Sequence, residues 1–333
     1  MANVGAAELA VRMSWQRIYL CAVLAAAFGL RLYRLDAQSL WFDEGFALHL
    51  SSQGIRQLIE QNPVGWLPLH SAVLHFWLMV SGNSPFSARF LSVVFGTLVV
   101  AALYVFGRAL GTERTGSIAA MMGAFSPFLV YYSQEARVYS LWISVSLLAS
   151  YLLLRALGDP RRLRPWALYL GTLVAALYTH YFSVFLLPWG MAAVCYRAVR
   201  ERSRRVFLAG LCCQATAALT CLPLIGFVRS SAADPYGFWR SSLASSQVIV
   251  DLWYQFMTGG NLTLERSWPA MLAMVAAAVA GLLMFRPRWN AVLLLLYAAL
   301  PVLGMLILSS WRELYVSRYL AIALPAVLSL IHI

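Results

Sequence analysis

Two adjacent carboxylates, Asp43 and Glu44, stand in the stretch LWFDEGFALHL at residues 40–50, directly after an apolar run. A carboxylate within hydrogen-bond reach of a hydroxyl group can accept its proton as a new bond forms. The chain has only 13 acidic residues in 333, so a pair is the first candidate for chemistry. The structural alternative is that Asp43 caps a helix beginning at Glu44, where an acidic residue in the first turn is favoured.

Other segments hold polar residues of the kinds that bind substrates. Arg137 lies two residues before Tyr139, and Arg318 directly precedes Tyr319. A guanidinium group can take two phosphate oxygens at once, so both arginines are candidates for binding a phosphate. The segments in question are 131–140 (YYSQEARVYS), 179–181 (THY), 310–320 (SWRELYVSRYL), the longer loop 229–268, and the stretch that contains His70 and His75.

The elements that position these residues belong to a membrane protein. Hydrophobic residues make up 61% of the chain and charged residues only 11%, which lies far from the balance of soluble proteins. Several apolar runs approach the roughly 20 residues needed to cross a bilayer. They are residues 117–132, 140–157, 166–178, 206–228, 269–285 and 291–309. The sequence predicts an all-α, polytopic transmembrane bundle.

The net charge of +12 has an explanation other than nucleic acid. All 25 basic residues are arginine, and they cluster in the short connections 107–114, 155–164, 197–205 and 285–288. Cytoplasmic loops of membrane proteins carry such an excess of basic residues. We therefore expect membrane lipids around the chain and no nucleic-acid partner.

Charge also decides the topology. With Arg12 and Arg17 in the cytoplasm, a first crossing at residues 18–33 puts Asp43 and Glu44 outside. Counting the apolar run 66–80 as a span would move every later arginine cluster outside, so we interpret it as an interfacial helix. The cytoplasmic loops then hold 15 Arg against 4 acids, and the outer parts hold 10 Arg against 9 acids.

This topology predicts about ten spans, the last of them incomplete, in one membrane domain covering residues 1–333. The first outer loop is 34–85 and contains interfacial helices; the second is 229–268, with a further interfacial helix at 248–257. Every polar segment named above then lies at the outer membrane face. Convergence on one face is the strongest indication of a shared site.

No cofactor is required by the sequence. The five cysteines fall in apolar segments, and neither metal-ligand nor disulfide spacing is visible. A divalent metal is nevertheless a hypothesis, because Asp43, Glu44 and His70 could supply ligands.

Five motifs in order resemble the bacterial glycosyltransferases of family 39, the relatives of protein mannosyltransferases and aminoarabinose transferases with the GT-C fold. The likeness is dense over residues 30–200, although relatives continue well past residue 333. The motifs are LWFDE (40–44), PLH (68–70), ARFLSVVFG (88–96), SPFLVYYSQEARVYS (126–140) and RYL (318–320).

The resemblance implies a transferase in the bacterial inner (plasma) membrane, with its active site on the extracytoplasmic face. It would move a sugar, a mannose-like hexose or a related one, from a polyprenyl-phosphate carrier to a protein, glycan or lipid acceptor. Asp43 is the candidate base, and Glu44 would orient Asp43 or hold the sugar. Arg137, Arg318 and His180 would meet the charge of the leaving phosphate. The remaining candidates for donor binding are His70, Glu135, Tyr139, Tyr181 and Tyr319. A direct displacement would invert the anomeric carbon.

Other interpretations stay open at this point. A transporter or flippase of lipid-linked sugar would share the many spans, but the central spans contain none of the ionisable residues that ion coupling needs. A catalytically inactive relative is a second alternative. Glu135 and Arg137 could be solvated charges between two helices, and His180 could be a packing residue.

Overall fold

The computed structural model describes residues 2–60, 66–226, 229, 245–310 and 315–331. Every regular element that it assigns there is helical, as expected. The longer helices are α1 (Ala2–Leu32), α2 (Phe42–Ser52), α4 (Pro68–Ser81), α5 (Pro85–Leu110), α6 (Glu113–Phe125), α8 (Tyr139–Gly158), α9 (Leu163–Leu177), α10 (Leu186–Arg200), α11 (Arg204–Thr220), α13 (Ser245–Thr258), α14 (Leu264–Met284) and α15 (Arg288–Ser309). The shorter ones are α3 (Ile55–Glu60), α7 (Pro127–Ser133), η1 (Tyr181–Phe185), η2 (Leu222–Leu224), η4 (Ser317–Ala323) and α16 (Leu324–Leu330).

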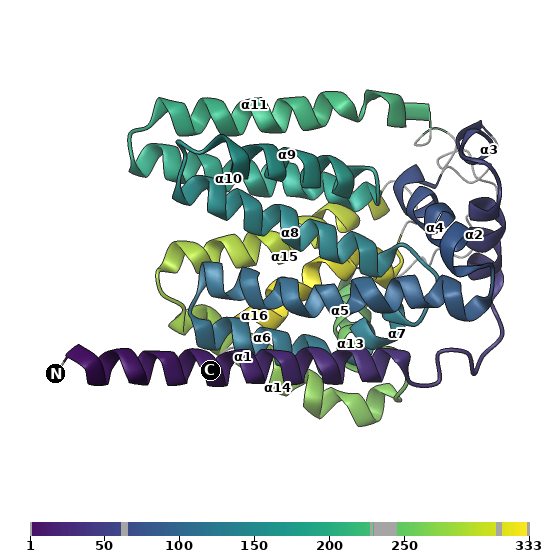
Figure 1. Ribbon diagram of the computed structural model, residues 1–333, viewed down its shortest axis with the longest axis horizontal. Coiled ribbons are helices and arrows are strands. Elements are labelled where there is room, and N and C mark those ends of the chain that lie inside the picture. The colour runs from purple at the N-terminus through teal and green to yellow at the C-terminus, as the bar shows by residue number, and fades with distance from the viewer. Residues whose placement is uncertain (1, 61–65, 227–228, 230–244, 311–314, 332–333) are drawn as a thin grey trace.

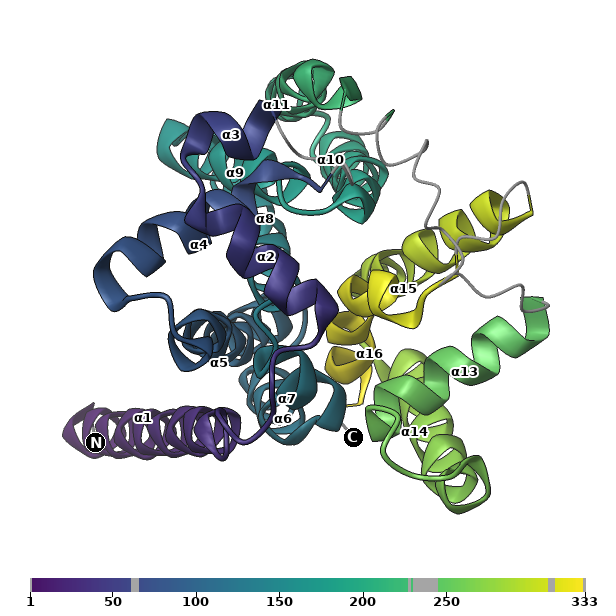
Figure 2. The same cartoon turned by 90° about the vertical axis from the view of Figure 1, so that its right-hand side faces the viewer.

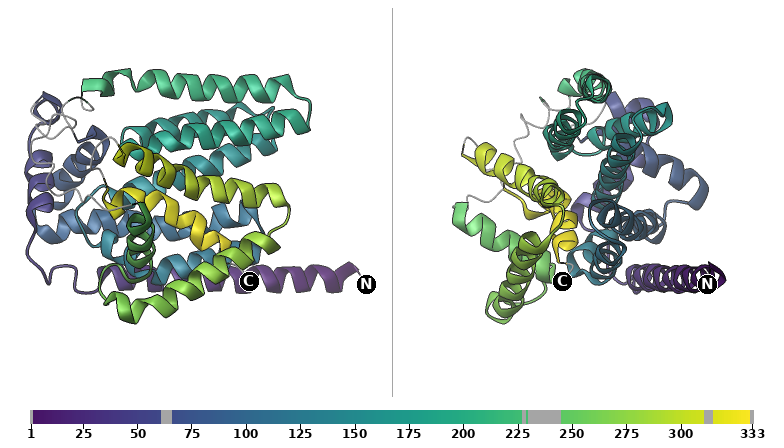
Figure 3. Two further views of the ribbon diagram at one scale, coloured as in Figure 1. Left: turned by 180° about the vertical axis from the view of Figure 1, so that it is seen from behind. Right: turned by 90° about the vertical axis from the view of Figure 1, so that its left-hand side faces the viewer.

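The long helices run side by side along one axis (Figure 1). Helices α2, α3, α4, α7 and α13 gather at one end of this bundle, which we call the site end. Figure 3 shows the same arrangement from behind, with the N-terminus projecting from the opposite end. The loops that carry the candidate residues therefore share one end, and the connection between α10 and α11 lies at the other.

Membrane-spanning character is evident in six segments of the described chain. By length and hydropathy these are Pro85–Leu110, Tyr139–Gly158, Tyr181–Arg200, Arg204–Leu224, Leu264–Met284 and Arg288–Ser309. Two shorter apolar helices, Leu163–Leu177 and Ser317–Leu330, accompany them. The polytopic α-helical class is thus confirmed, while the expected total of about ten spans stays a prediction.

Helix α4 lies across the bundle rather than along it. Seen from the site end, α5 and α6 appear end-on, whereas α2, α4 and α13 are seen from the side (Figure 2). Pro68 begins α4 at its first turn, where a proline is favoured, and Gly82 ends it with a φ of 82°. This orientation agrees with the interfacial helix expected at residues 66–80. Helix α13 also lies across the bundle, in agreement with the interfacial helix expected at residues 248–257.

Close approach of helices gives the bundle a dense interior. A Cβ on Gly116 would lie 2.4 Å from the carbonyl oxygen of Tyr104, so α5 and α6 touch through backbone at this point. Elsewhere in the interior, Trp142 and Trp189 are fully buried, and the Trp189 indole donates a hydrogen bond to the Leu293 carbonyl at 2.9 Å. Bulky aromatic groups with satisfied polar atoms make this a rigid frame for the loops.

A buried arginine fixes α1 against the loop that carries Glu135 and Arg137. Arg31 is 0% exposed and donates to the carbonyls of Gly123 and Ala124 in the last turn of α6, and to the Ser133 hydroxyl at 3.1 Å. A cation is favourable beside the negative end of a helix dipole. In return, the Gln134 amide donates to carbonyls at the end of α1, including that of Arg31 at 3.1 Å. The two side chains thus set the position of the loop from both sides.

Candidate active site

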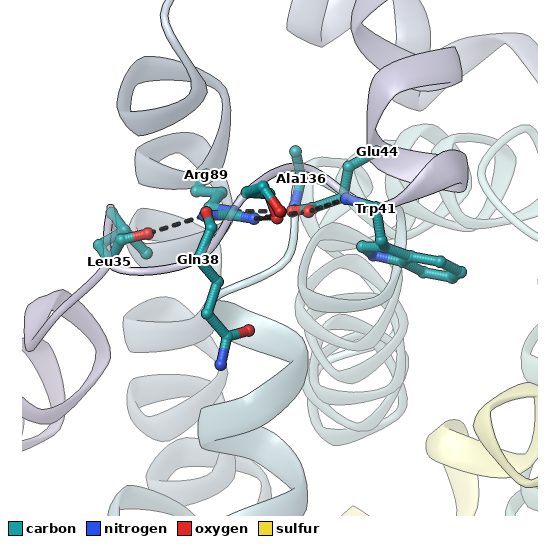
Figure 4. Close-up of polar contacts among 7 residues, drawn as sticks. Leu35, Gln38, Trp41, Glu44, Arg89 and Ala136 are labelled. Atoms are coloured by element: carbon teal, nitrogen blue, oxygen red, sulfur yellow. Dashed lines mark hydrogen bonds and ion pairs between the residues drawn. The ribbon is translucent and has the colours of Figure 1, made fainter.

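The Glu44 side chain is held by hydrogen bonds from Arg89 and from two backbone amides (Figure 4). It is 1% exposed, and Arg89 of α5 donates to both of its oxygens, at 2.9 Å to Oε1 and 2.7 Å to Oε2. The rest of the Arg89 guanidinium donates to the carbonyls of Leu35, Gln38 and Ser39. A paired and fully hydrogen-bonded buried charge of this kind stabilises one arrangement of the surrounding chain.

Two backbone amides complete the shell around Glu44. The N–H of Ala136 donates to Oε1 at 2.8 Å, and the N–H of Trp41 donates to Oε2 at 3.4 Å. Helix α2 begins at Phe42 with Trp41 as its N-cap residue, so Glu44 caps the helix from its third position. Helix capping, the structural alternative to a chemical role, therefore applies to Glu44 and not to Asp43. Both Glu44 oxygens are thus occupied by protein donors, and the expectation that Glu44 could hold the sugar is not supported.

Asp43 is placed between two arginines that are distant in the sequence. Its Oδ2 atom lies 3.3 Å from Nη2 of Arg137 and 3.5 Å from Nη2 of Arg318. Arg137 also donates to the Asp43 backbone carbonyl at 3.4 Å. The Asp43 side chain is 20% exposed, so it is the carboxylate of the pair that a substrate can reach. The sequence-predicted cluster of Asp43, Arg137 and Arg318 is thus brought together.

Each of these guanidinium groups lies over an indole ring. The distance from Cζ to the ring centroid is 4.1 Å for Arg137 over Trp66 and 5.5 Å for Arg318 over Trp41. Such contacts hold a cation in place without using its N–H donors. The Nε atoms of both arginines are buried and have no hydrogen-bond partner among the described residues. The described residues therefore leave these two Nε donors unused.

Glu135 is the third acidic group of the site. It is 7% exposed, and its Oε2 atom has no hydrogen-bond partner among the described residues. Burial raises the pKa of Glu135 to about 7, against opposing effects of the facing Tyr131 hydroxyl and of Arg137. Arg137 is 8% exposed. The alternative that Glu135 and Arg137 are solvated charges between helices is therefore wrong.

Two histidines are buried in the neutral form. Burial lowers the pKa of His180 to about 3, with Arg137 and Arg318 contributing. The pKa of His70 is likewise lowered to about 3 by burial and by Arg137. His180 stacks on Trp142 with ring centroids 3.8 Å apart, and its Nδ1 accepts a hydrogen bond from the Phe182 amide at 3.2 Å. The expectation that His180 meets the phosphate as a cation is corrected, because a desolvated imidazole beside two arginines stays uncharged.

The candidate tyrosines line the same region. Tyr139 is 1% exposed, with its hydroxyl facing Arg137. The Tyr319 ring lies 5.5 Å from the His180 ring, centroid to centroid. Tyr181 begins η1 and is half-buried. Tyr139 and Tyr319 both interact electrostatically with Arg318.

A metal site does not form from the candidate ligands. Among the residues that the structure describes, no three His, Cys, Asp or Glu side chains lie close enough to hold a metal ion. Glu44 is already engaged by Arg89. The hypothesis that Asp43, Glu44 and His70 supply metal ligands therefore finds no geometric support.

Sequence reasoning missed residues that organise the site. Arg89 belongs to the motif ARFLSVVFG at residues 88–96. The sequence does not indicate that the side chain of an arginine near the start of a helix turns inward. Trp66 was assigned to an interfacial helix, but its ring supports Arg137. The Tyr315 hydroxyl donates to Asp251 of α13 at 2.7 Å and so ties α13 to the segment that carries Arg318. A pairing over 64 residues has no local signal.

Comparison with known proteins gives two kinds of match. The family described as dolichyl-phosphate-mannose-protein mannosyltransferase matches residues 62–227. The undecaprenyl phosphate-alpha-4-amino-4-deoxy-L-arabinose arabinosyl transferase of Pseudomonas aeruginosa is 27% identical over 233 residues, which is 66% of this chain and 42% of that protein. A short match to the plug domain of Sec61p covers residues 218–247, of which 230–244 lie outside the described residues.

Solved structures show the same fold. ArnT from Cupriavidus metallidurans bound to undecaprenyl phosphate matches 96% of this chain and 59% of its own, with a TM-score of 0.61 and 15% identity. The oligosaccharyltransferase AglB from Archaeoglobus fulgidus, in complex with an inhibitory peptide and a dolichol-phosphate, has a TM-score of 0.63 and 14% identity over 96% of this chain and 50% of that one.

The chain thus spans 42% of the curated relatives that it matches and about half of the similar solved chains. The match over residues 62–227 overlaps the region of dense motif likeness at residues 30–200, and the helical architecture is shared over nearly the whole chain. Over residues 62–227 the chain is similar to the dolichyl-phosphate-mannose-protein mannosyltransferase family, and it shares the helical GT-C fold of the solved ArnT and AglB structures.

Proposed function

We propose that the chain is a membrane glycosyltransferase that takes a sugar from a polyprenyl-phosphate carrier and passes it to an acceptor hydroxyl group. One observation carries the proposal: the Asp43 carboxylate lies between Arg137 and Arg318, at 3.3 and 3.5 Å. A proton acceptor and two cations for a leaving phosphate thus occupy one place. Transfer from a phosphate-linked donor needs this combination.

The transfer itself is a single displacement. The acceptor oxygen bonds to the anomeric carbon and loses its proton to Asp43. The bond from that carbon to the phosphate oxygen breaks, and the electron pair stays on the lipid phosphate. Arg137 and Arg318 stabilise the charge that develops there. One displacement inverts the anomeric configuration.

The arginine contacts of Asp43 are long enough to be shared. Charge-assisted N–H···O bonds are typically about 2.7–2.9 Å long, whereas both contacts of Asp43 exceed 3.2 Å. Stacking on Trp66 and Trp41 holds the guanidinium groups while their Nε donors have no partner among the described residues. A phosphate can therefore bind both arginines while Asp43 keeps its place.

Substrate class and membrane side are part of the proposal. A mannose-like hexose or a related sugar, including an aminopentose, is the donor sugar, and a protein, glycan or lipid is the acceptor. The printed names of the relatives, which include a mannosyltransferase and an arabinosyl transferase, support this range. The arginine-rich loops at the opposite end support a bacterial inner-membrane orientation with the site end outside.

The experiment compares donor classes. Membranes that contain the chain are incubated with radiolabelled sugar attached either to a polyprenyl phosphate or to a soluble nucleotide. We expect label to pass to an acceptor only from the lipid-linked donors. Transfer from the nucleotide sugar alone, or from neither class, would contradict the proposal.

A further inference from the structure

Glu135 is a buried acid for which the transfer described above has no use. Its carboxyl group lies in the loop between α7 and α8, two residues before Arg137, and is 7% exposed. One oxygen faces the Tyr131 hydroxyl, and Oε2 has no hydrogen-bond partner among the described residues. A buried carboxylate oxygen without a hydrogen-bond partner costs free energy unless a substrate donates a hydrogen bond to it or a proton neutralises it.

Charged and titratable groups surround Glu135 on every side. They come from five elements: Glu44 from α2, Arg89 from α5, Tyr131 and Tyr132 from α7, Arg137 from the same loop, and Arg318 from η4. The Arg89–Glu44 pair is closed by its own hydrogen bonds. The remaining charges are those of Arg137, Arg318, Asp43 and Glu135.

The charges of these four groups cancel only when Glu135 is ionised. Asp43 offsets one of the two arginines, and ionised Glu135 offsets the other. A phosphodiester that binds Arg137 and Arg318 brings one further negative charge into this buried place. A like charge nearby disfavours the ionised form of a carboxyl group, so the arriving anion favours a proton on Glu135.

We propose that Glu135 is a proton-linked acid of the site: it takes up a proton when a lipid phosphodiester binds beside Arg137 and Arg318, and it returns this proton to the phosphate that is released. The inference rests on the proposed function for its second half only. Its first half concerns binding and is tested without turnover.

The proton balance closes over one transfer. Before the reaction Glu135 is neutral, Asp43 is ionised and the donor phosphodiester carries one negative charge. The acceptor proton passes to Asp43, the bond from sugar to phosphate breaks, and the lipid phosphate gains a second negative charge. Glu135 then protonates the phosphate oxygen, which leaves Glu135 ionised, Asp43 neutral and the phosphate with one charge. Passage of the proton from Asp43 to Glu135, directly or through solvent, resets the site.

The titration range of Glu135 fits this cycle. Burial raises its pKa to about 7, so near neutral pH both forms are populated. A carboxyl group of ordinary pKa, about 4.3, would give up its proton too readily to hold one at pH 7. The group is therefore balanced between the two states that the cycle needs.

Binding gives the first test. The probe is a short-chain polyprenyl methyl phosphodiester, which carries one charge throughout the pH range used. Calorimetric titration of the full chain at pH 7, in two buffers of different ionisation heat, measures proton uptake. We expect uptake of about 0.4 proton per site and a binding constant that weakens up to about tenfold per pH unit above pH 7. Glu135→Gln should bind without uptake.

Glu60→Gln is the matched control, because Glu60 is a solvent-exposed acid of α3 paired with Arg56 at 2.9 Å. This variant should keep the uptake of the wild type. Uptake that persists in Glu135→Gln, or its absence in the wild type, would overturn the inference. Failure of the probe to bind at all would overturn it as well.

Kinetics give the second test and separate this inference from the proposed function. With saturating donor, the wild-type rate should fall as pH rises, because the acid must be protonated. Glu135→Gln should be about 10²-fold slower with this pH dependence removed, whereas Glu135→Asp should shift the dependence and keep it. A wild type that binds with proton uptake but transfers no sugar would contradict the proposed function and the return of the proton, while leaving the uptake established. A Glu135→Gln variant with wild-type rates and pH profile would refute the role of Glu135 as the acid that protonates the phosphate.

Discussion

Glu44 and Arg89 form a buried ion pair, with Oε2 and Nη2 2.7 Å apart and side chains 1% and 5% exposed. The pair connects α2 to α5, and the Ala136 amide adds the loop that carries Arg137. Because Glu44 turns inward, its neighbour Asp43 is presented to the arginines. Of two adjacent carboxylates, one organises the site and the other is available to substrate.

Breaking this pair should destabilise the protein. Glu44→Leu or Arg89→Met alone leaves an uncompensated buried charge, which typically costs about 3–5 kcal/mol. The double variant should lose clearly less than the sum of the two single losses, because neither charge remains. Unfolding in mixed detergent micelles measures all four proteins. Additive losses would show that the pair does not act as a unit.

Arg137 should determine the use of the donor. Arg137→Ala removes a guanidinium that is 8% exposed and contacts Asp43, so the apparent KM for a polyprenyl-phosphate donor should rise and kcat should fall while the protein stays folded. Arg137→Lys should recover only part of the loss, since a point charge cannot hold two oxygens in a plane. Arg56→Ala, at an exposed arginine of α3, is the control. Full activity in Arg137→Ala would remove Arg137 from the mechanism.

Acidification should destabilise the protein through its neutral buried histidines. The pKa of His180 is about 3 in the folded state against about 6.5 in an unfolded chain. Between these values the unfolded state binds the proton and the folded state does not, so stability falls as pH decreases from 6.5. Replacing His180 by Phe keeps an aromatic ring on Trp142 and should flatten this dependence by up to about 1.4 kcal/mol per pH unit. Parallel curves for the two proteins would contradict the buried neutral form.

Glu135 should act in the opposite direction. Its folded pKa of about 7 lies above the ordinary value, so the folded state binds the extra proton between about pH 4.5 and 7. This contribution to stability is present at low pH and is lost as pH rises through 7. It partly offsets the histidines in the wild type, so the His180→Phe comparison is best made as a difference between the two curves.

Labelling from outside intact cells tests the topology. In a background without the five native cysteines, a membrane-impermeant thiol reagent should reach Gln53→Cys and miss Ser203→Cys. The reason is that position 53 follows α2 at the site end, while position 203 lies in the connection between α10 and α11 at the other end (Figure 1). The reverse pattern would place the candidate site in the cytoplasm.

Much of the fold could be predicted from the sequence. Hydropathy indicates which segments form apolar helices, and clusters of arginine indicate the connections between them. An interfacial helix at residues 66–80 was expected from the placement of the arginines and the short length of the run, and α4 lies across the bundle, which agrees with that prediction. The cluster of Asp43, Arg137 and Arg318 followed from motifs at one predicted face. The position of α4 and the cluster of Asp43, Arg137 and Arg318 both depend on which end of a helix a residue occupies. Hydropathy and the placement of charged residues predict this from the sequence.

The different roles expected of Asp43 and Glu44 came from the family resemblance, and the residue pattern alone could not predict which of the two carboxylates is buried. Asp43 and Glu44 are consecutive on one helix and point in different directions, so only the position of Arg89 in three dimensions decides which one is buried. The lowered pKa of His180 likewise depends first on burial and then on two arginines from other elements. The charge states of buried groups depend on neighbouring residues from distant segments, and the sequence alone does not show which segments lie close together.

The most direct test of the proposed function is transfer of labelled sugar from a polyprenyl-phosphate donor by wild type, Asp43→Asn and Asp36→Asn, expressed at equal levels. Asp36 is an exposed acid in the connection between α1 and α2 and serves as the matched control. We expect transfer by the wild type and by Asp36→Asn, and a loss of about 10²-fold or more in Asp43→Asn. Equal transfer by all three proteins would contradict the role of Asp43 as the proton acceptor of the site.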